Sequence, residues 1–234
     1  MIELKNVKKS YGKRVIIDDL SLVIKKGSVF GFLGQNGAGK TTTIKMMVGI
    51  AAPDRGEILI GGENSQNVDT RENIGFMPEA PYFYDRLTGL EFVKFCGNLF
   101  KKHKSEKEYA DILGETGIYE ARNIPINKYS KGMKQRLGFA QVMVNDPDCI
   151  FLDEPLDGLD PLGRREIKKI ILGLKARNKT VFFNSHILYD TEEICDEIGI
   201  IHGGKLLYSG GVKGFCKGES LEKKFVETVE AREK

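Results

Sequence analysis

The segment from Gly34 to Thr41 reads Gly-Gln-Asn-Gly-Ala-Gly-Lys-Thr and fits the pattern G-x-x-x-x-G-K-[ST]. It follows an apolar run, 28–33, that suits a buried strand, and it precedes a run, 41–50, with helical periodicity. Glycines let backbone N–H groups converge on phosphate oxygens, and a helix N-terminus favours anions. An incidental glycine-rich turn is the alternative, but the strand–loop–helix context favours the phosphate site. The predicted nucleotide-binding residues are Gly34, Gln35, Asn36, Gly37, Ala38, Gly39, Lys40, Thr41 and Thr42.

Two side chains of this loop are expected to have different roles in binding. Lys40 would supply a positive charge to the β- and γ-phosphates of a nucleotide. The Thr41 hydroxyl would ligate Mg²⁺. The motif therefore predicts a site for a nucleoside triphosphate together with its magnesium ion.

Two carboxylates, Asp153 and Glu154, follow the apolar run 149–152. Open α/β sheets bind ligands at the carboxyl ends of their parallel strands, so these groups should reach the same site. Asp153 is placed to orient Mg²⁺ through water, and Glu154 could polarise an attacking water as a general base. The pair could also be a simple polar strand end; the phosphate loop in the same chain favours the catalytic interpretation.

Apolar runs separated by turns predict the strands that position these motifs. The first sixty residues contain several such runs, with turns near Gly12 and Gly27, and are expected to form an N-terminal antiparallel β part. Later runs alternate with helical patterns, one of which Pro161 opens. Such alternation predicts an α/β fold with a parallel sheet flanked by helices. These later runs are residues 149–152, 180–183 and 198–201.

Helical periodicity replaces the alternation between about residues 85 and 145. We expect this stretch to be an all-helical subdomain inserted into one α/β domain that spans residues 1–215. Residues 216–234 are expected to form a charged helical tail. The aromatic cluster of Tyr82, Phe83 and Tyr84, just before the insertion, could belong to its core or line a groove for a partner helix.

Composition excludes several classes of protein. The 234 residues are 41% hydrophobic and 29% charged, which argues against wholesale disorder. The net charge is +3 and the longest basic run is 101–104, so nucleic acid is not an expected partner. We expect neither a membrane span nor a signal peptide. The cysteines form no metal-type pair, and a reduced, intracellular state is expected. They are Cys96, Cys149, Cys195 and Cys216.

Segments in a fixed order resemble one family, the ATP-binding cassette (ABC) ATPases, over essentially residues 1–215. Residues 129–136, Tyr-Ser-Lys-Gly-Met-Lys-Gln-Arg, are similar to the family signature, usually Leu-Ser-Gly-Gly-Gln followed by a polar residue, Gln and Arg. The resemblance implies a P-loop NTPase fold, ATP as the nucleotide and Mg²⁺ as its metal. It also implies signature contacts to the ATP of an opposite subunit by Ser130, Lys131, Gly132 and Met133.

Four further positions take roles that the resemblance implies. Tyr11 resembles the aromatic residue that stacks on adenine, and His186 resembles the switch histidine at the γ-phosphate. Asp160 lies in a segment similar to the loop that crosses between two cassettes. Residues 75–79 resemble the loop that senses the γ-phosphate, with Glu79 as a metal ligand.

The signature and the phosphate loop would be two separate anion sites in one chain, and two anion sites for one nucleotide suggest two chains. Ser130 and Gly132 stand at a predicted helix N-terminus, which favours an anion. Two chains arranged head to tail about a two-fold axis would place the signature of one against the phosphate loop of the other, in a homodimer or a heterodimer. ATP would then hold the dimer closed, and hydrolysis would release it.

The chain departs from the family pattern at two motifs. Glu79 stands where the family usually has glutamine; it can still ligate Mg²⁺ but adds negative charge near phosphate. Lys131 replaces the first signature glycine and Met133 the glutamine, whereas Ser130 and Gly132 are retained. These variants resemble the drug-, antibiotic- and sodium-exporting branch.

The resemblance implies the ATP-hydrolysing subunit of an ABC transporter, expected to be an exporter. A separate integral membrane permease would supply the pathway, and the subunit would sit peripherally on the cytoplasmic face of the cell membrane. The main alternative is a soluble ABC ATPase that acts on ribosomes or DNA; those usually have tandem cassettes or a long coiled-coil insertion. A P-loop kinase would give no reason for the signature at Ser130.

Overall fold

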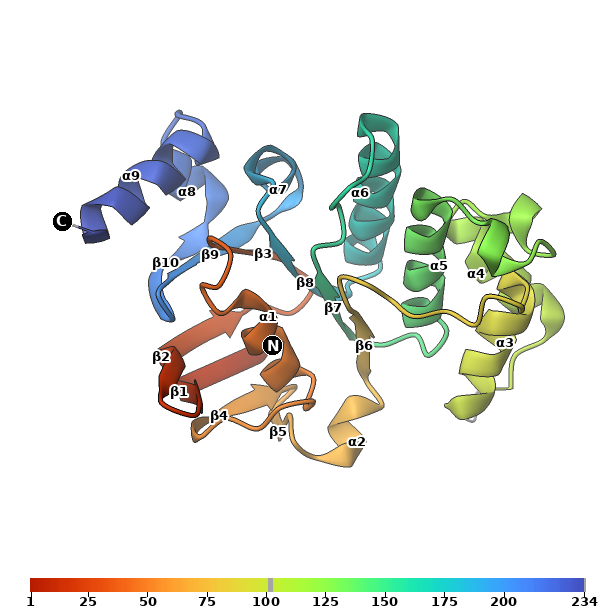
Figure 1. The fold of residues 1–234 in the computed structure, drawn as a ribbon, viewed down its shortest axis with the longest axis horizontal. Helices are drawn as coiled ribbons and strands as arrows, with labels where there is room; N and C mark the ends of the chain where they lie inside the picture. The colour runs from red at the N-terminus through yellow and green to blue at the C-terminus, as the bar shows by residue number, and fades with distance from the viewer. Residues whose placement is uncertain (101–102, 234) are drawn as a thin grey trace.

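The computed structural model describes residues 1–100 and 103–233 (Figure 1). Three residues discussed above lie outside the described residues. They are Lys101 and Lys102 of the basic run and Lys234 of the predicted tail. Among the described residues, the main sheet has six strands in the order β10-β9-β3-β8-β7-β6, of which only the edge strand β10 runs antiparallel to its neighbour. These strands are β3 (Val29–Leu33), β6 (Ile74–Met77), β7 (Cys149–Asp153), β8 (Thr180–Ser185), β9 (Glu197–His202) and β10 (Lys205–Gly211).

The central strands are apolar at consecutive positions because both faces of the sheet are covered. Every residue of β3, β7 and β8 is buried. Aromatic rings from all three strands meet on one face: Phe30 and Phe182 stack with centroids 5.7 Å apart, and Phe151 lies 6.0 Å from Phe182. The predicted parallel sheet flanked by helices is confirmed.

A second, antiparallel sheet of four strands, ordered β2-β1-β4-β5, forms the N-terminal part. Its strands are β1 (Ile2–Tyr11), β2 (Arg14–Ile24), β4 (Arg55–Ile60) and β5 (Glu63–Asn64). Helix α1 (Lys40–Met47) packs between the sheets, in contact with β2, β4 and β7. The buried side chains of Ile44, Met46 and Met47 join both sheets into one core, which fixes the start of α1 against the end of β3.

The described part of the segment between β6 and β7 is helical and lies at one end of the molecule, at the right in Figure 1. Two of its helices begin with complete capping boxes, formed by Thr88 with Glu91 and by Ser105 with Glu108. The segment has a core of its own, which includes Phe92. Its helices are α3 (Gly89–Leu99), α4 (Glu106–Glu115) and α5 (Lys131–Met143), with the 3₁₀ turns η1 (Tyr119–Ala121) and η2 (Ile126–Lys128).

Two helices follow β7 and β8 along the chain. Helix α6 (Pro161–Ala176) follows β7 and begins at Asp160, whose side chain caps it, and α7 (Leu188–Ile194) follows β8. The buried Lys168 of α6 pairs with Asp190 of α7 at 2.8 Å. Burial alone would lower the pKa of Lys168, but hydrogen bonds to Asp190 and Glu193 raise it above its ordinary value. This ion pair holds the two helices, and the loops before them, together.

The C-terminal segment packs on the body instead of extending from it. Helices α8 (Val212–Cys216) and α9 (Leu221–Glu233) lie beside β9 and β10 in Figure 1. Leu221 is fully buried and shares a core cluster with Leu33 and Ile200. The division of the chain at residue 215 remains a prediction.

Two details differ from the sequence analysis. Residues 75–77, expected to be part of a loop, form most of strand β6, and the loop begins only at Pro78. Four residues are too few to show a strand pattern, so the pairing with β7 decides the structure there. Strand β10 and the short helix α2 (Val68–Arg71) had no counterpart in the prediction. None of the described helices is long and apolar enough to cross a membrane.

Candidate functional site

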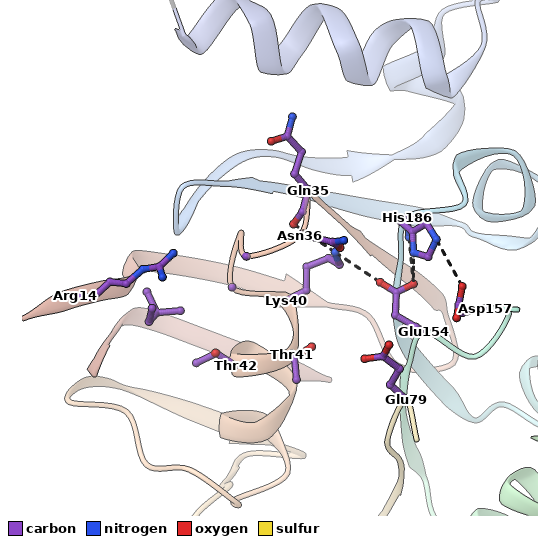
Figure 2. A pocket seen from close by; sticks show the side chains of 13 residues that line it. Arg14, Gln35, Asn36, Lys40, Thr41, Thr42, Glu79, Glu154, Asp157 and His186 are labelled. Atoms are coloured by element: carbon purple, nitrogen blue, oxygen red, sulfur yellow. Dashed lines mark hydrogen bonds and ion pairs between the residues drawn. The ribbon is translucent and has the colours of Figure 1, made fainter. Parts of the chain in front are cut away.

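The predicted phosphate loop connects β3 to α1, at the carboxyl edge of the sheet (Figure 2). Gly39 has a φ of 111°, a conformation that suits only glycine, and a Cβ there would lie 2.4 Å from Ile17 Cδ1. A Cβ on Gly34 would lie 2.4 Å from the Ile201 carbonyl oxygen. The glycines therefore allow the loop to pack tightly against both sheets.

Lys40 is almost buried, with 7% of its surface exposed. Its ammonium group donates to the Gly34 carbonyl oxygen at 2.7 Å and lies 3.6 Å from Glu154 Oε1. A buried ammonium needs such partners, since an unpaired charge in the interior is strongly unfavourable. The loop thus holds a positive charge at the point where phosphates are expected.

Asp153 ends strand β7 and is 3% exposed. Its Oδ1 accepts hydrogen bonds from the Thr41 hydroxyl at 3.3 Å and from Asn184 Nδ2 at 2.8 Å. Because the Thr41 hydroxyl donates a hydrogen bond to Asp153, the lone pairs of its oxygen remain available to bind a cation. A carboxylate beside a hydroxyl fits Mg²⁺, which prefers oxygen ligands and few protein contacts. The described residues contain no cluster of three or more His, Cys, Asp or Glu that could hold a metal alone.

Glu154 follows Asp153 and has a φ of 49°, uncommon for a residue with a side chain. The turn directs its carboxylate toward His186, whose Nδ1 lies 2.9 Å from Glu154 Oε2. The other ring nitrogen, Nε2, lies 3.8 Å from Asp157 Oδ1. Figure 2 shows His186 between the two carboxylates, with Lys40 on the far side of Glu154. The histidine is half exposed, so it can meet a ligand in the cleft.

Lys40, Thr41, Glu154 and His186 line one cleft of about 590 Å³, and the buried Asp153 adjoins it through its hydrogen bond with Thr41. Most of the predicted phosphate loop, Glu79, Glu154 and His186 contribute to its wall. Three further lining residues were not predicted: Arg14 and Ile16 of β2, and Asp157. Arg14 and Ile16 reach the cleft only through the packing of the N-terminal sheet, and no motif marks them. Asp157 lies inside the segment predicted to cross between cassettes.

Besides the signature residues, five predicted residues are not part of the cleft wall: Tyr11, Gly34, Ala38, Asp153 and Asp160. Tyr11 is 52% exposed and ends β1. It pairs with Arg14 of β2, which is a residue of the cleft wall. Asp160 is exposed and caps α6, its Oδ1 accepting from the Gly163 N–H at 2.9 Å. Their roles in adenine stacking and dimer contact remain predictions.

The predicted signature lies at the N-terminus of α5, outside the cleft of its own chain. Ser130 is exposed and its hydroxyl caps the helix by accepting from the Met133 N–H at 3.2 Å. Lys131 is also exposed, and its ammonium group lies 3.8 Å from Asp157 Oδ2. Gly132 and Met133 are partly exposed in the first turn. A signature so placed is open to a second molecule.

Comparison with known families decides the assignment, since the profile of the family described as "ABC transporter" matches residues 17–157. The chain belongs to the ABC transporter family. The matched span contains the phosphate loop, the segment predicted as the signature, Asp153 at the end of β7 and Glu154 after it.

Several curated proteins are similar to this cassette. It is 36% identical over 225 residues to the lantibiotic transport ATP-binding protein SrtF of Streptococcus pyogenes, covering 96% of each chain. It is 40% identical over 210 residues to the bacitracin transport ATP-binding protein BcrA of Bacillus licheniformis, covering 88% of this chain and 68% of that one. Two uncharacterized ABC transporter ATP-binding proteins, from Synechocystis sp. and Nostoc sp., are 45% and 44% identical; the matches span only 56% and 61% of their lengths.

Solved structures agree with the fold. The structure of an ATP-binding subunit of an ABC transporter superposes with a TM-score of 0.87 at 29% identity, over 97% of this chain and 99% of that one. A dimeric post-hydrolysis state of an ATP-binding cassette, bound to ADP and Pi, superposes with a TM-score of 0.82 at 25% identity, over 92% and 100% of the two chains. The predicted P-loop NTPase fold is therefore confirmed.

Proposed function

We propose that the chain is the ATP-hydrolysing subunit of an ABC exporter and energises a separate membrane permease. One observation carries the catalytic part: the buried Lys40, Thr41 and the Glu154–His186 pair line one cleft, and Asp153 is hydrogen-bonded to Thr41 beside it. If these residues had only structural roles, they would not need to lie around one shared cleft. The similarity to bacitracin and lantibiotic transport ATP-binding proteins supports the exporter part.

ATP binding would use the loop's backbone N–H groups, the N-terminus of α1 and the Lys40 ammonium group. Mg²⁺, held by Thr41 with Asp153 and with Glu79 as a further candidate ligand, would neutralise charge on the phosphate oxygens. Glu79 is exposed on the cleft wall just after β6. We assign the phosphates to the end of the cleft lined by Lys40 and Thr41, and the base to the end beside Tyr11.

Hydrolysis would begin with a water in line with the γ-phosphate. Glu154 accepts a proton from this water as its oxygen bonds to the γ-phosphorus and the bond to the bridging oxygen breaks, which yields ADP and phosphate. His186, in contact with Glu154 at 2.9 Å, orients the carboxylate and is placed to donate to a γ-phosphate oxygen. The positive-φ turn at Glu154 aims the base into the cleft.

A dimer would complete each site. The cleft lacks signature residues of its own chain, and the signature at α5 faces outward, so a second ABC subunit supplies the missing half in a head-to-tail arrangement. The similarity to a dimeric cassette supports this arrangement. In the closed dimer, Asp160 and Asp157 would lie near the two-fold axis.

The permease would dock beside the loop that follows β6. Tyr82 and Tyr84 are 85% and 51% exposed, and Tyr84 packs edge-on against Phe95 of α3 at 5.3 Å. Exposed aromatic side chains of this kind anchor interfaces. The loop begins at the γ-phosphate end of the cleft with Glu79, so a partner bound there would sense the nucleotide.

A complex with a membrane permease would place the subunit on the cytoplasmic face of the membrane. A soluble cassette that acts on ribosomes or DNA is not favoured by the relatives.

The test replaces the proposed base while it preserves the shape of the site. Glu154→Gln is nearly isosteric but cannot accept a proton, so we expect hydrolysis to fall by about 100-fold or more, within the range of general-base contributions. ATP should still bind and trap a dimer that light scattering detects, whereas wild-type protein should return to monomer as ATP is consumed. Near-normal turnover in the variant would contradict the role of Glu154; a monomer that stays monomeric with ATP would contradict the dimer.

A further inference from the structure

Asn184 is a buried polar residue that no motif marks. It stands in β8 between Phe183 and Ser185 and is fully buried. A neutral amide buried without hydrogen bonds is unfavourable by about 1–3 kcal/mol, so an apolar residue would be the default in such a strand. Its presence requires a reason in its surroundings.

The reason is the neighbouring strand. Asn184 is in register with Asp153 of β7, and its Nδ2 donates to Asp153 Oδ1 at 2.8 Å. The reverse orientation of the amide would place two oxygens in contact, so the nitrogen must face the carboxylate. The same Oδ1 accepts from Thr41, and the two donors together fix the orientation of the carboxylate.

A neutral donor suits this position better than a charged one. Lysine or arginine would also fix the carboxylate but would cancel the negative charge that attracts a divalent cation. The amide orients Asp153 and leaves its charge intact. Nearby Lys40 does not take this role, since its ammonium group pairs with Glu154.

The other end of the amide is also informative. Asn184 Oδ1 is buried and has no hydrogen-bond partner within the described part of the chain. Buried polar atoms in folded proteins nearly always have a partner, protein or water. Because an unpartnered buried acceptor is unfavourable, the hydrogen bond that Asn184 donates to Asp153 is what explains an amide at this position.

We propose that Asn184 is a positioning residue for the magnesium site, which holds the Asp153 carboxylate in place through its Nδ2. The inference rests on the proposed function, since it concerns the metal of the ATP site. Asn184 itself contacts neither the nucleotide nor the metal. Partners that orient metal ligands typically change metal affinity by about 10- to 100-fold when removed.

The experiment measures metal dependence rather than turnover. Asn184→Leu, of similar size, and Asn184→Ala are made in the Glu154→Gln variant, which binds ATP without consuming it. Affinity for a fluorescent ATP analogue is measured in excess EDTA and along a Mg²⁺ titration. We expect the midpoint of the Mg²⁺ titration to rise by about 10-fold or more, and the affinity in EDTA to change by less than about twofold.

Thr180→Val is the matched control. Thr180 is another buried polar residue of β8, and its hydroxyl accepts from the Gly27 N–H at the opposite end of the strand. Its loss should leave the Mg²⁺ midpoint unchanged. An unchanged midpoint in a folded Asn184 variant, or an equal loss of affinity in EDTA, would overturn the inference. Parent protein whose ATP affinity ignores Mg²⁺ would contradict the proposed function and, with it, the role of Asn184.

Discussion

At the scale of single residues, the site depends on conformations and burial that are unfavourable in isolation. The positive φ of Glu154 is strained by about 1–3 kcal/mol for a residue with a Cβ. Lys40 and Asp153 are charged and almost buried. Each is stabilised by a specific neighbour, Glu154 for Lys40 and Asn184 for Asp153. The surrounding strands thus hold the charges in place before a ligand arrives, which lowers the reorganisation needed in the reaction.

The role of Lys40 can be tested by Lys40→Ala. Removal of a charged donor to phosphate should lower ATP affinity on the order of 100-fold, because charge-assisted hydrogen bonds are the strong ones. Lys45→Ala is the control, since Lys45 lies in the same helix but is exposed. Equilibrium binding of a fluorescent ATP analogue at equal salt measures both. Equal affinities for the Lys40 variant and wild-type protein would contradict the phosphate site.

At the scale of elements, the aromatic cluster before α3 divides into two roles. Phe83 is buried and packs edge-on against Phe92 at 5.2 Å, whereas Tyr82 and Tyr84 face solvent. The core interpretation therefore holds for Phe83, whereas the two tyrosines are exposed and their contact with a partner helix remains a prediction. The alternation between exposed and buried side chains at these three positions cannot be predicted from the residue types, because all three residues are aromatic.

Phe83→Ala should reduce the free energy of unfolding by about 3–5 kcal/mol, the usual effect of removing a buried phenylalanine. The paired substitution Tyr82→Ser with Tyr84→Ser should change it by less than about 1 kcal/mol, since both side chains are exposed. Urea denaturation measures both. The tyrosine variant should also co-purify less permease while its basal ATPase activity persists. Undiminished co-purification would move the docking surface to another face.

The sequence predicts the parts of the site that are local and misses those that depend on pairing. The phosphate loop and Asp153–Glu154 are recognisable because each motif and its flanking strand or helix are contiguous. Asn184 and Arg14 reach the site only because distant strands pair or pack, and no local spacing encodes that. For the same reason the sequence predicts a loop at residues 75–77, whereas the ladder with β7 makes them part of strand β6. The helical insertion is long and periodic, so its character was visible in advance.

At the scale of the whole molecule, the proposed head-to-tail dimer gives each chain halves of two different sites. The cleft lies at the carboxyl edge of the sheet, and the predicted signature stands at the start of α5 in the helical segment. The Lys168–Asp190 pair between α6 and α7 keeps the loops with Asp157 and His186 in a fixed relation. The chain is therefore expected to dimerise as a nearly rigid body, with the bound nucleotide providing most of the interaction that stabilises the dimer.

Mixing two inactive variants tests this shared architecture. Lys40→Ala removes the phosphate site of a chain, and Ser130→Glu places a negative charge in its signature, so homodimers of either variant hold no intact site. In a mixed dimer, the phosphate loop of the Ser130 variant meets the signature of the Lys40 variant, and one site is complete. Random pairing makes about half of the dimers mixed, each with one intact site of two, so about a quarter of wild-type ATPase activity should return. Mixing Lys40→Ala with the double variant restores no site and serves as the control. If both single variants fold and their mixture stays as inactive as the control, two copies of this chain do not share their ATP sites.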